Sequence, residues 1–558
     1  MKHFIIALLV SAVALQAAPS IVGRIVDEQT RKPLPGANVI VHGRSQGTTS
    51  DQRGRFVLSG LAAGRYHITV SYLGYQAWDK IVPVSDGDAD SLVVALSPSP
   101  LPFSEVVVST TKYDKELVDV SLPLTVVRAE QIARQAPLTI ADAVQNEPGV
   151  SLVRDGIWGT TVNIRGLSRN SIVTLVDGYR IDTANDLAAG LAMFDVYDIE
   201  RVEVVKGGAS SLYGSGAVGG AINIITKDGW YQEKPYLQAH LATRYASVND
   251  GNLGHLSATM GGKQWHLRTS ALLRSAGDAS TPAGTLLNSQ FKDNNVSARL
   301  GVRPFKKHEL GLNYQRYRAT DVGLPGGYPL FPVQADVRYP KETRELKSVS
   351  YSINDLSRYF LKASITAFQQ YIERDVENIP HQVTLQPASG STPPRRVSVL
   401  KIAPGATHET RGFQAQTDWH WGGNHYVIAG FDGWQKEYRG YRTKETKIEV
   451  LNPVTGAVQK TTMKTIGELP IPDAFYRSLG FYGSYEMQIF QDRLQVTLGG
   501  RGDQISVQND VGLNPLYEVT DGVRNDTPAG QKVLWQSRKA SDRSWSLSNF
   551  PLRWPCRE

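Results

Sequence analysis

The sequence predicts a mainly β protein: a small β-sandwich, then an α+β domain, then a partial antiparallel transmembrane β-barrel. Three observations predict this class. Short apolar strands alternate with glycine turns at the start, helical and strand patterns mix in the next part, and long segments of alternating polarity follow. At 558 residues the chain can bury several cores. Its 51 glycines, 24 tyrosines and 10 tryptophans suit a β protein with turns and aromatic girdles.

Composition and charge exclude several classes of function. The net charge of +7 is small for this length and the charges are interspersed, so we expect no nucleic-acid partner. A single cysteine, Cys556, excludes an internal disulfide framework. The 11 histidines lack the spacing of metal ligands, so we expect no metal site. No nucleophile with its base and no carboxylate pair can be assigned, so we expect neither an enzyme nor a cofactor.

Residues 1–18 have the pattern of a cleaved secretory signal peptide. Lys2 precedes an apolar run from Phe4 to Leu15, and the small residues Ala17 and Ala18 mark the expected cleavage region. The run is shorter than the roughly 20 residues of a membrane-spanning helix. An exported chain without such a helix is either soluble outside the inner membrane or a β-barrel in the outer membrane.

Residues 19–97 are predicted to form the small β-sandwich. Ile21–Val26 and Ala37–Val41 read as strands on either side of a proline and glycine turn, and His67–Tyr72 reads as a further strand. This sequence pattern resembles that of the carboxypeptidase-regulatory-like domain. The resemblance implies an accessory role, and the segment contains no catalytic constellation.

Residues 98–121 combine a linker with a short strand. Pro98, Pro100 and Pro102 make the linker stiff and keep it out of a sheet interior. The strand lies in a segment that consists of Glu105, Val106, Val107, Val108, Ser109 and Thr110. Such a strand either adds to the sheet edge of a partner or begins the next domain. Its position between a linker and a domain favours the first interpretation.

Residues 122–228 mix helical and strand patterns. A strand is predicted at 124–127, strands and a turn at 162–166 and 172–178, and helices at 129–134 and 139–144, the second with Thr139 as its N-cap. In Ile199–Lys227, two β-branched runs flank a stretch that is rich in glycine. Glycine permits positive φ and close backbone approach, so this segment predicts a strand, a compact loop and a second strand. The glycines are Gly207, Gly208, Gly214, Gly216, Gly219 and Gly220.

The same loop also contains the spacing of a dinucleotide-binding fingerprint, at Gly214, Gly216 and Gly219. That fingerprint requires a helix after the glycines, so that its N-terminal N–H groups face the pyrophosphate. Residues Ala221–Thr226 favour a strand instead. We therefore prefer a loop packed inside a larger shell to a nucleotide site.

Three segments, Asn163–Gly166, Leu175–Ile181 and Ile199–Lys227, together resemble the plug domain of TonB-dependent outer-membrane receptors of the siderophore, haem or cobalamin type. The resemblance implies active uptake of a metal chelate or a similar small ligand through the outer membrane. It makes residues 105–110 the TonB box, which a TonB-type energy-transducing protein captures by strand addition.

The resemblance also implies ion pairs between the plug and the barrel. Arg165 and Arg201 match plug positions that pair with glutamates of the barrel wall in this family. Glu486 is the wall partner that we predict. Such a charge-assisted pair in a partly dry lumen would hold the plug and remain breakable.

Residues 229–530 are predicted to form the N-terminal part of the barrel, in contact with outer-membrane lipid. Segments with one apolar and one polar side, such as Trp265–Arg274 and Phe413–Trp421, alternate over about 10 residues, as transmembrane strands do. We count about eleven strand candidates between Tyr236 and Val507. Trp419 with Trp421 suits an interfacial belt. Gly323–Arg338 and Pro380–Pro404 are predicted to be extracellular loops.

The alternation ends at about Gln531, and residues 531–558 are predicted to be an aberrant tail without strands. The resemblance implies a closed barrel with about twice as many strands, because lipid cannot satisfy an open sheet edge. We therefore expect a truncated or frame-shifted product. The alternative is a secreted β-rich protein that binds a ligand or a partner without transport.

Overall fold

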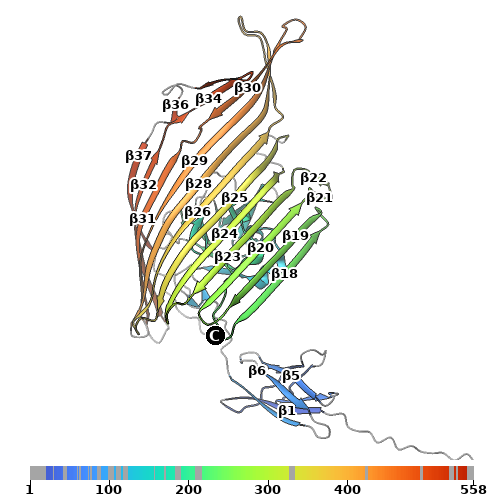
Figure 1. Ribbon diagram of the computed structural model, residues 1–558, viewed down its shortest axis with the longest axis vertical. Helices are drawn as coiled ribbons and strands as arrows, with labels where there is room; N and C mark the ends of the chain where they lie inside the picture. Colours follow the sequence, from blue (N-terminus) through green and yellow to red (C-terminus); the bar gives the residue numbers. More distant parts are fainter. Residues whose placement is uncertain are drawn as a thin grey trace, which may run out of the picture. The chain divides into compact units, whose positions relative to one another are not determined.

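The computed structural model describes most of the chain in two compact units, the first of which extends to Val106 (Figure 1). The predicted signal peptide and the proline linker lie outside the described residues. No helix in the described part is long and apolar enough to cross a membrane. The described residues are 20–28, 30–41, 47–59, 61, 64–72, 75, 78–84, 90–97, 106–107, 115–116, 123–155, 158–168, 171–181, 190–207, 216–325, 334–421, 425–489, 494–513, 515–526, 533–535 and 538–548.

The first unit contains the predicted β-sandwich. In one sheet, β1 (Ser20–Asp27) lies between β4 (Arg55–Ser59) and β7 (Asp90–Leu96). Apolar side chains alternate along the strands and meet between the sheets, where Phe56 and Ile68 are buried. The order of the second sheet is β3 (Gly47–Thr49), β2 (Asn38–Val41), β5 (Gly64–Ser71) and β6 (Trp78–Val84).

The plug is the α+β domain that the sequence predicted. Its five-stranded sheet has the order β10 (Leu124–Arg128), β16 (Ile199–Lys206), β17 (Gly220–Thr226), β14 (Ile172–Val176) and β15 (Tyr179–Ile181). A second sheet consists of β11 (Val150–Asp155), β12 (Gly159–Ile164) and β13 (Leu167–Ser168). The helices are α1 (Ala129–Gln135), α2 (Ile140–Val144) and the short 3-10 turns η3 (Gly190–Ala192) and η4 (Val196–Asp198).

Two local predictions for the plug are confirmed. Thr139 is the N-cap of α2 and forms a capping box with Asp142. A strand, β17, follows the glycines where a nucleotide site would need a helix. Gly220 has a φ of 144°, and a Cβ there would lie 2.2 Å from the carbonyl oxygen of Val205. Gly207 and Gly216 also have positive φ, Gly219 packs against Leu167 and Ser171, and Gly208 and Gly214 lie outside the described residues.

A curved wall of long antiparallel strands encloses the plug, which lies behind β24 to β26 in Figure 1. Thirteen of its described strands begin between Tyr236 and Val507, where about eleven were predicted, and eleven of these pair in succession. They are β18 (Tyr236–Ala246), β19 (Gly251–Gly261), β20 (Trp265–Ala276), β23 (Phe291–Val302), β24 (His308–Leu324), β25 (Asp336–Asn354), β26 (Phe360–Ile379), β28 (Arg395–Trp421), β29 (His425–Leu451), β31 (Ala474–Ile489) and β32 (Leu494–Asn509).

Shorter strands extend the wall or form hairpins beside it. The strand β30 (Val458–Glu468) follows β29 in the chain and pairs with it. It also pairs with β34 (Tyr517–Thr520), which in turn pairs with β35 (Val523–Asp526). The other short strands are β21 (Ala279–Thr281), β22 (Gly284–Leu286), β27 (Val383–Gln386), β33 (Gly512–Leu513) and β36 (Val533–Trp535).

Two regions differ from the sequence prediction. Residues Pro380–Pro404 were predicted to be a loop, but they include β27 and the first part of β28, which pair with each other. The segment 531–558 was predicted to lack strands, but it contains β37 (Arg538–Ser548), which pairs with β32. Backbone pairing needs no alternation of side chains, so the pattern in the sequence did not reveal this strand. Within the described sheet, β18 pairs only with β19, and β37 only with β32.

The two faces of the wall have the polarity that the alternation predicted. On β20, Trp265 and Leu273 are 42% and 69% exposed on the outer face. His266, Arg268 and Arg274 alternate with them and are buried on the inner face, toward the plug. The wall therefore has an apolar outside and a polar inside.

Candidate functional site

The deepest contact between plug and wall is made by Trp158 of the plug, which is 1% exposed. Its ring centroid lies 4.6 Å from that of Phe291 on β23 and 6.4 Å from that of Tyr317 on β24. The guanidinium carbon of Arg274 lies 5.0 Å from the Trp158 ring. Aromatic contacts and a cation over the ring both favour this position, so Trp158 joins the core of the plug to the wall.

Wall arginines bind carbonyl oxygens of the plug next to α1. Arg244 on β18 donates to the carbonyl of Ala136 at 2.6 Å, and Arg274 on β20 donates to that of Leu138 at 2.6 Å. Arg274 also forms a bidentate pair with Asp293 of β23. Because the carbonyl of Ala136, at the C-cap of α1, lacks a partner within the helix, the wall cation Arg244 is favourable there.

Two aspartates of the plug bind arginines of the wall. Asp198, at the end of η4, lies 2.8 Å from Arg268 of β20. Asp177, in the turn after β14, lies 2.8 Å from Arg299 of β23. Both pairs are mostly buried, so their interaction is stronger than that of a surface pair.

A third aspartate of the plug, Asp195, is buried beside His255 of β19, with 3.4 Å between its Oδ2 and Nε2 of the histidine. The backbone N–H of Tyr197 donates to the other oxygen of Asp195. Burial, together with the nearby charge of Asp198, raises the pKa of Asp195 to about 7. Asp195 therefore titrates near neutral pH at the interface between plug and wall.

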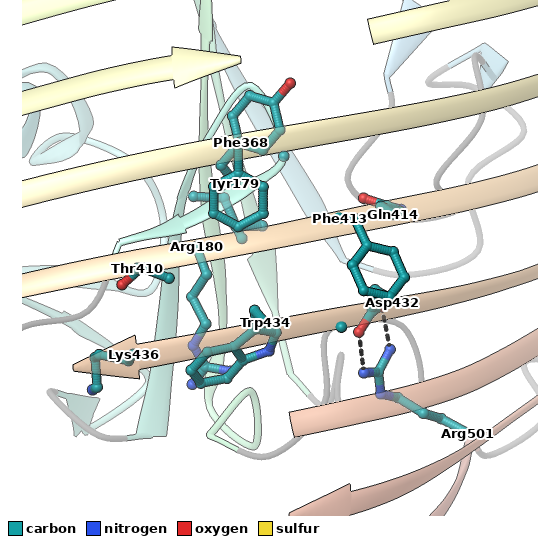
Figure 2. Close-up of a pocket in the computed structure, with 13 residues that line it drawn as sticks. Tyr179, Arg180, Phe368, Thr410, Phe413, Gln414, Asp432, Trp434, Lys436 and Arg501 are labelled. Carbon is teal, nitrogen blue, oxygen red and sulfur yellow. Dashed lines mark hydrogen bonds and ion pairs between the residues drawn. The ribbon is translucent and has the colours of Figure 1, made fainter. Parts of the chain in front are cut away.

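A small cavity of about 70 Å³ lies between the β14–β15 hairpin of the plug and wall strands β26, β28 and β29 (Figure 2). Tyr179 and Arg180 enter it from the plug. The ring of Tyr179 lies 4.9 Å from that of Phe368, and the guanidinium carbon of Arg180 lies 5.7 Å from the Trp434 ring. The cavity thus combines aromatic faces with a cation, and both the plug and the wall contribute to it.

The opposite side of the cavity carries an ion pair. Arg501 of β32 donates to the two oxygens of Asp432 at 2.8 and 2.7 Å, and also binds Asp503 (Figure 2). In the sequence, Arg501 and Asp503 belong to an Arg-Gly-Asp tripeptide at the end of a predicted strand. Both are buried inside the wall, so this tripeptide is part of the lumen and not a surface motif.

The outer face of the wall carries an apolar band with an aromatic girdle at one edge. Phe413, Phe431 and Phe481 are exposed on the neighbouring strands β28, β29 and β31. At the end of β28, the rings of Trp419 and Trp421 stack with centroids 5.9 Å apart. An apolar band that ends in aromatic side chains is typical of a barrel surface in contact with lipid.

Comparisons with known proteins agree with this architecture. The family model of the TonB-dependent Receptor Plug Domain matches residues 116–221, and that of the CarboxypepD_reg-like domain matches residues 21–108. The chain thus contains a plug domain of the kind that TonB-dependent receptors have, and a CarboxypepD_reg-like domain before it. The predictions of a plug, of a carboxypeptidase-regulatory-like domain and of a mainly β fold are confirmed.

Individual similar proteins match parts of this chain. The vitamin B12 transporter BtuB of Photobacterium profundum is 33% identical over 146 residues, which are 24% of each chain. The solved copper transporter OprC has a TM-score of 0.55 at 17% identity and covers 76% of this chain and 60% of its own. The siderophore receptor PiuA of Acinetobacter baumannii has a TM-score of 0.54 at 15% identity, with 80% and 64% covered. The match to BtuB thus spans about a quarter of that relative's length.

The predicted TonB box of this chain is described only in part. Val106 and Val107 form the short strand β8, which pairs with β9 (Lys115–Glu116). Glu105, Val108, Ser109 and Thr110 lie outside the described residues. A strand at this position agrees with the β-branched pattern, and its role as the TonB box stays a prediction.

The predicted ion pairs between plug and wall are not seen among the described residues. Arg201 binds Glu203, which is two residues along the same face of β16, at 2.7 Å. Arg165 is exposed in the turn after β12 with a φ of 51°. Glu486 is buried on β31, in register with Tyr426 and Thr497. Among the described residues, neither arginine pairs with Glu486, because a nearer carboxylate binds one and the turn exposes the other.

The ion pairs that the structure does show have the opposite polarity, with arginines on the wall and aspartates on the plug. The sequence contained part of this signal. Arg268, Arg274 and Arg299 fall on the polar side of alternating segments, and such positions face the lumen. Their aspartates could not be found from the pattern, because Arg268 and Asp198 are 70 residues apart.

Proposed function

We propose that this chain is a TonB-dependent transport receptor that carries a scarce small ligand across the outer membrane of a Gram-negative-type cell. The observation that carries the proposal is a plug packed against the polar face of a wall whose other face is apolar. A soluble sandwich buries its apolar faces against each other, whereas this wall exposes one of them.

The outer face supports a position in the membrane. Its apolar band includes Phe413 and ends at Trp419 and Trp421 on one side. On the other side, the outward positions Arg411 and Glu409 form an ion pair at 2.6 Å. The change from phenylalanine to charge along a single strand marks where lipid would give way to water.

The cavity between plug and wall supports a ligand that is anionic and has a flat or apolar part. Arg180 and Lys436 offer positive charge, while Tyr179 and Trp434 offer ring faces. Iron–siderophore complexes, haem and cobalamin are the ligand classes that we propose. The names of the similar proteins include vitamin B12, copper and siderophores, so they support transport of a scarce nutrient more than one particular ligand.

The energy for transport would come through the segment 105–110. We propose that a TonB-type transducer pairs with Val106 and Val107 by main-chain hydrogen bonds and pulls on the plug. In a strand-addition complex every backbone N–H on the paired side contributes. Replacement of Val107 by proline removes one of these donors, whereas replacement by threonine keeps it.

Uptake and binding measured on the same cells test this proposal. Cells that produce the protein receive labelled ferric siderophores, haem or cobalamin, and the Val107→Pro and Val107→Thr variants serve as a matched pair. We expect one ligand to be bound and imported, with import lost in Val107→Pro but kept in Val107→Thr. Binding without import by the unchanged protein, or recovery of the protein only in the soluble fraction, would instead support a secreted binding protein.

A further inference from the structure

Two arginines stand directly opposite each other on neighbouring strands of the wall. Arg268 of β20 and Arg299 of β23 are register partners, and both bind groups of the plug. Like charges directly opposite each other on paired strands destabilise the pairing. The wall therefore contains a local repulsion that other charges have to compensate.

Each of the two arginines is compensated by a different aspartate of the plug. Arg268 approaches Oδ1 of Asp198 with Nε at 2.9 Å and Nη2 at 2.8 Å. Ser297 of β23 donates to Oδ2 of the same aspartate at 2.7 Å. Arg299 lies 2.8 Å from Oδ2 of Asp177 and 3.5 Å from Oδ2 of the more exposed Asp228. The plug thus supplies two buried carboxylates, with Asp228 beside them, where the wall presents two positive charges.

Both aspartates lie at the same end of the plug sheet. Asp177 follows β14 and Asp198 precedes β16, while Thr226 ends β17 between them. The hydroxyl of Thr226 donates to Asp177, and the backbone N–H of Lys227 donates to the carbonyl of Asp198. Arg299 donates to the carbonyl of Thr226 at 3.4 Å. Three strand ends therefore meet the arginines as one rigid unit.

We propose that Arg268, Arg299, Asp198 and Asp177 form an electrostatic clasp that stabilises the plug and the wall at the same time. The aspartates hold the plug in place, and they also neutralise the repulsion between β20 and β23. Removal of the plug charges would therefore loosen these two wall strands as well as the plug. The clasp goes beyond the proposed transport, and it holds whichever ligand is carried.

Hydrogen exchange of the full chain in detergent micelles tests the clasp. Asp198→Asn and Asp177→Asn change the shape little and remove the charge. We expect roughly ten- to hundredfold faster exchange of amides in β16 and β17 and also in β20 and β23. Glu233→Gln breaks the exposed pair with Lys263 and should change neither region.

A second variant separates the clasp from simple packing. If Asp198 only packs the plug, Asp198→Asn would speed exchange in the plug and leave β20 and β23 unchanged, which would overturn the proposal. In a background of Arg268→Gln the repulsion is already gone. There we expect Asp198→Asn to have no further effect on β20 and β23, and an undiminished effect would equally overturn the clasp.

Discussion

The β-sandwich and the plug bury their apolar residues in different ways. Among the described residues, the core of the sandwich consists of side chains between Ile21 and Leu96. The core of the plug continues into the wall, where Phe291, Tyr317 and Leu346 belong to the same buried cluster as Trp158. A domain with its own closed core can fold alone, whereas a domain that shares its core depends on its container.

The plug is also held by buried polar contacts with the wall. Arg268 and Arg299 bind Asp198 and Asp177, and Arg244 binds a helix-end carbonyl. Charged pairs depend on geometry and are lost together when the two surfaces separate, whereas apolar contacts are less directional. This arrangement would hold the plug firmly in place and let it be released as a whole, as the proposed transport requires.

The largest predicted effect comes from Trp158, because it joins the two halves of the shared core. Trp158→Ala should destabilise the plug by about 4 kcal/mol through lost burial and a cavity. Trp158→Phe should cost clearly less, since a ring remains beside Phe291 and Tyr317. Limited proteolysis in micelles would report the change as faster cleavage of the plug. Equal rates of cleavage in both variants would show that an aromatic ring at this position does not stabilise the plug.

A comparable substitution in the sandwich core should destabilise the sandwich and leave the plug unaffected. Ile68 is fully buried in that core, and Ile68→Ala should destabilise the sandwich by about 3 kcal/mol. Chemical unfolding of the full chain should then show an earlier transition of the sandwich and an unchanged plug. A plug transition that moves with it would show that the two cores are coupled.

A smaller effect is a pH dependence that only the plug should have. The pKa of Asp195 rises from 3.8 to about 7 on burial, so the folded chain binds a proton that the unfolded chain has lost. The contribution of this group to stability is full below about pH 4 and declines as the pH rises through about 7.

The variant Asp195→Asn resembles the protonated carboxyl and provides the control. Between pH 5 and pH 8, the free energy of unfolding of the plug should fall more steeply in the unchanged protein than in Asp195→Asn. His255, Asp198 and the other groups that face Asp195 are common to both proteins, so their titration is present in both curves. Parallel curves would contradict the assignment.

The smallest effect concerns the cap of α2. Thr139→Ala removes the capping box with Asp142 and should cost about 1 kcal/mol. Thr139→Ser keeps the hydroxyl and should cost almost nothing. Thermal unfolding of the plug region should place the serine variant with the unchanged protein and the alanine variant below it.

Local features were predictable from the sequence because their causes are local. Thr139 at its cap, the strand after the glycine loop and the exposed side of Trp265 all follow from neighbours in the chain. Pairings across the lumen were not, because a carboxylate close by in the chain can bind an arginine first. Arg201 binds Glu203, two residues along the same strand, and no pair with the predicted wall partner Glu486 is seen among the described residues.

The edge of the wall shows a second limit. The sequence from Gln531 lacks alternation, yet β37 pairs with β32 over its whole length, from Arg538 to Ser548. Backbone hydrogen bonds with an existing strand edge are enough to define a strand, and they leave no mark in the side-chain pattern.

Separate production of residues 20–97 and of residues 123–228, followed by chemical unfolding, tests whether the plug needs the wall to fold while the sandwich does not. We expect one cooperative transition for the sandwich and none for the plug, because the plug core is completed by Phe291, Tyr317 and Leu346 of the wall. A cooperative transition of the isolated plug, with slow amide exchange in β16 and β17, would show that the plug folds without the wall and would contradict this expectation.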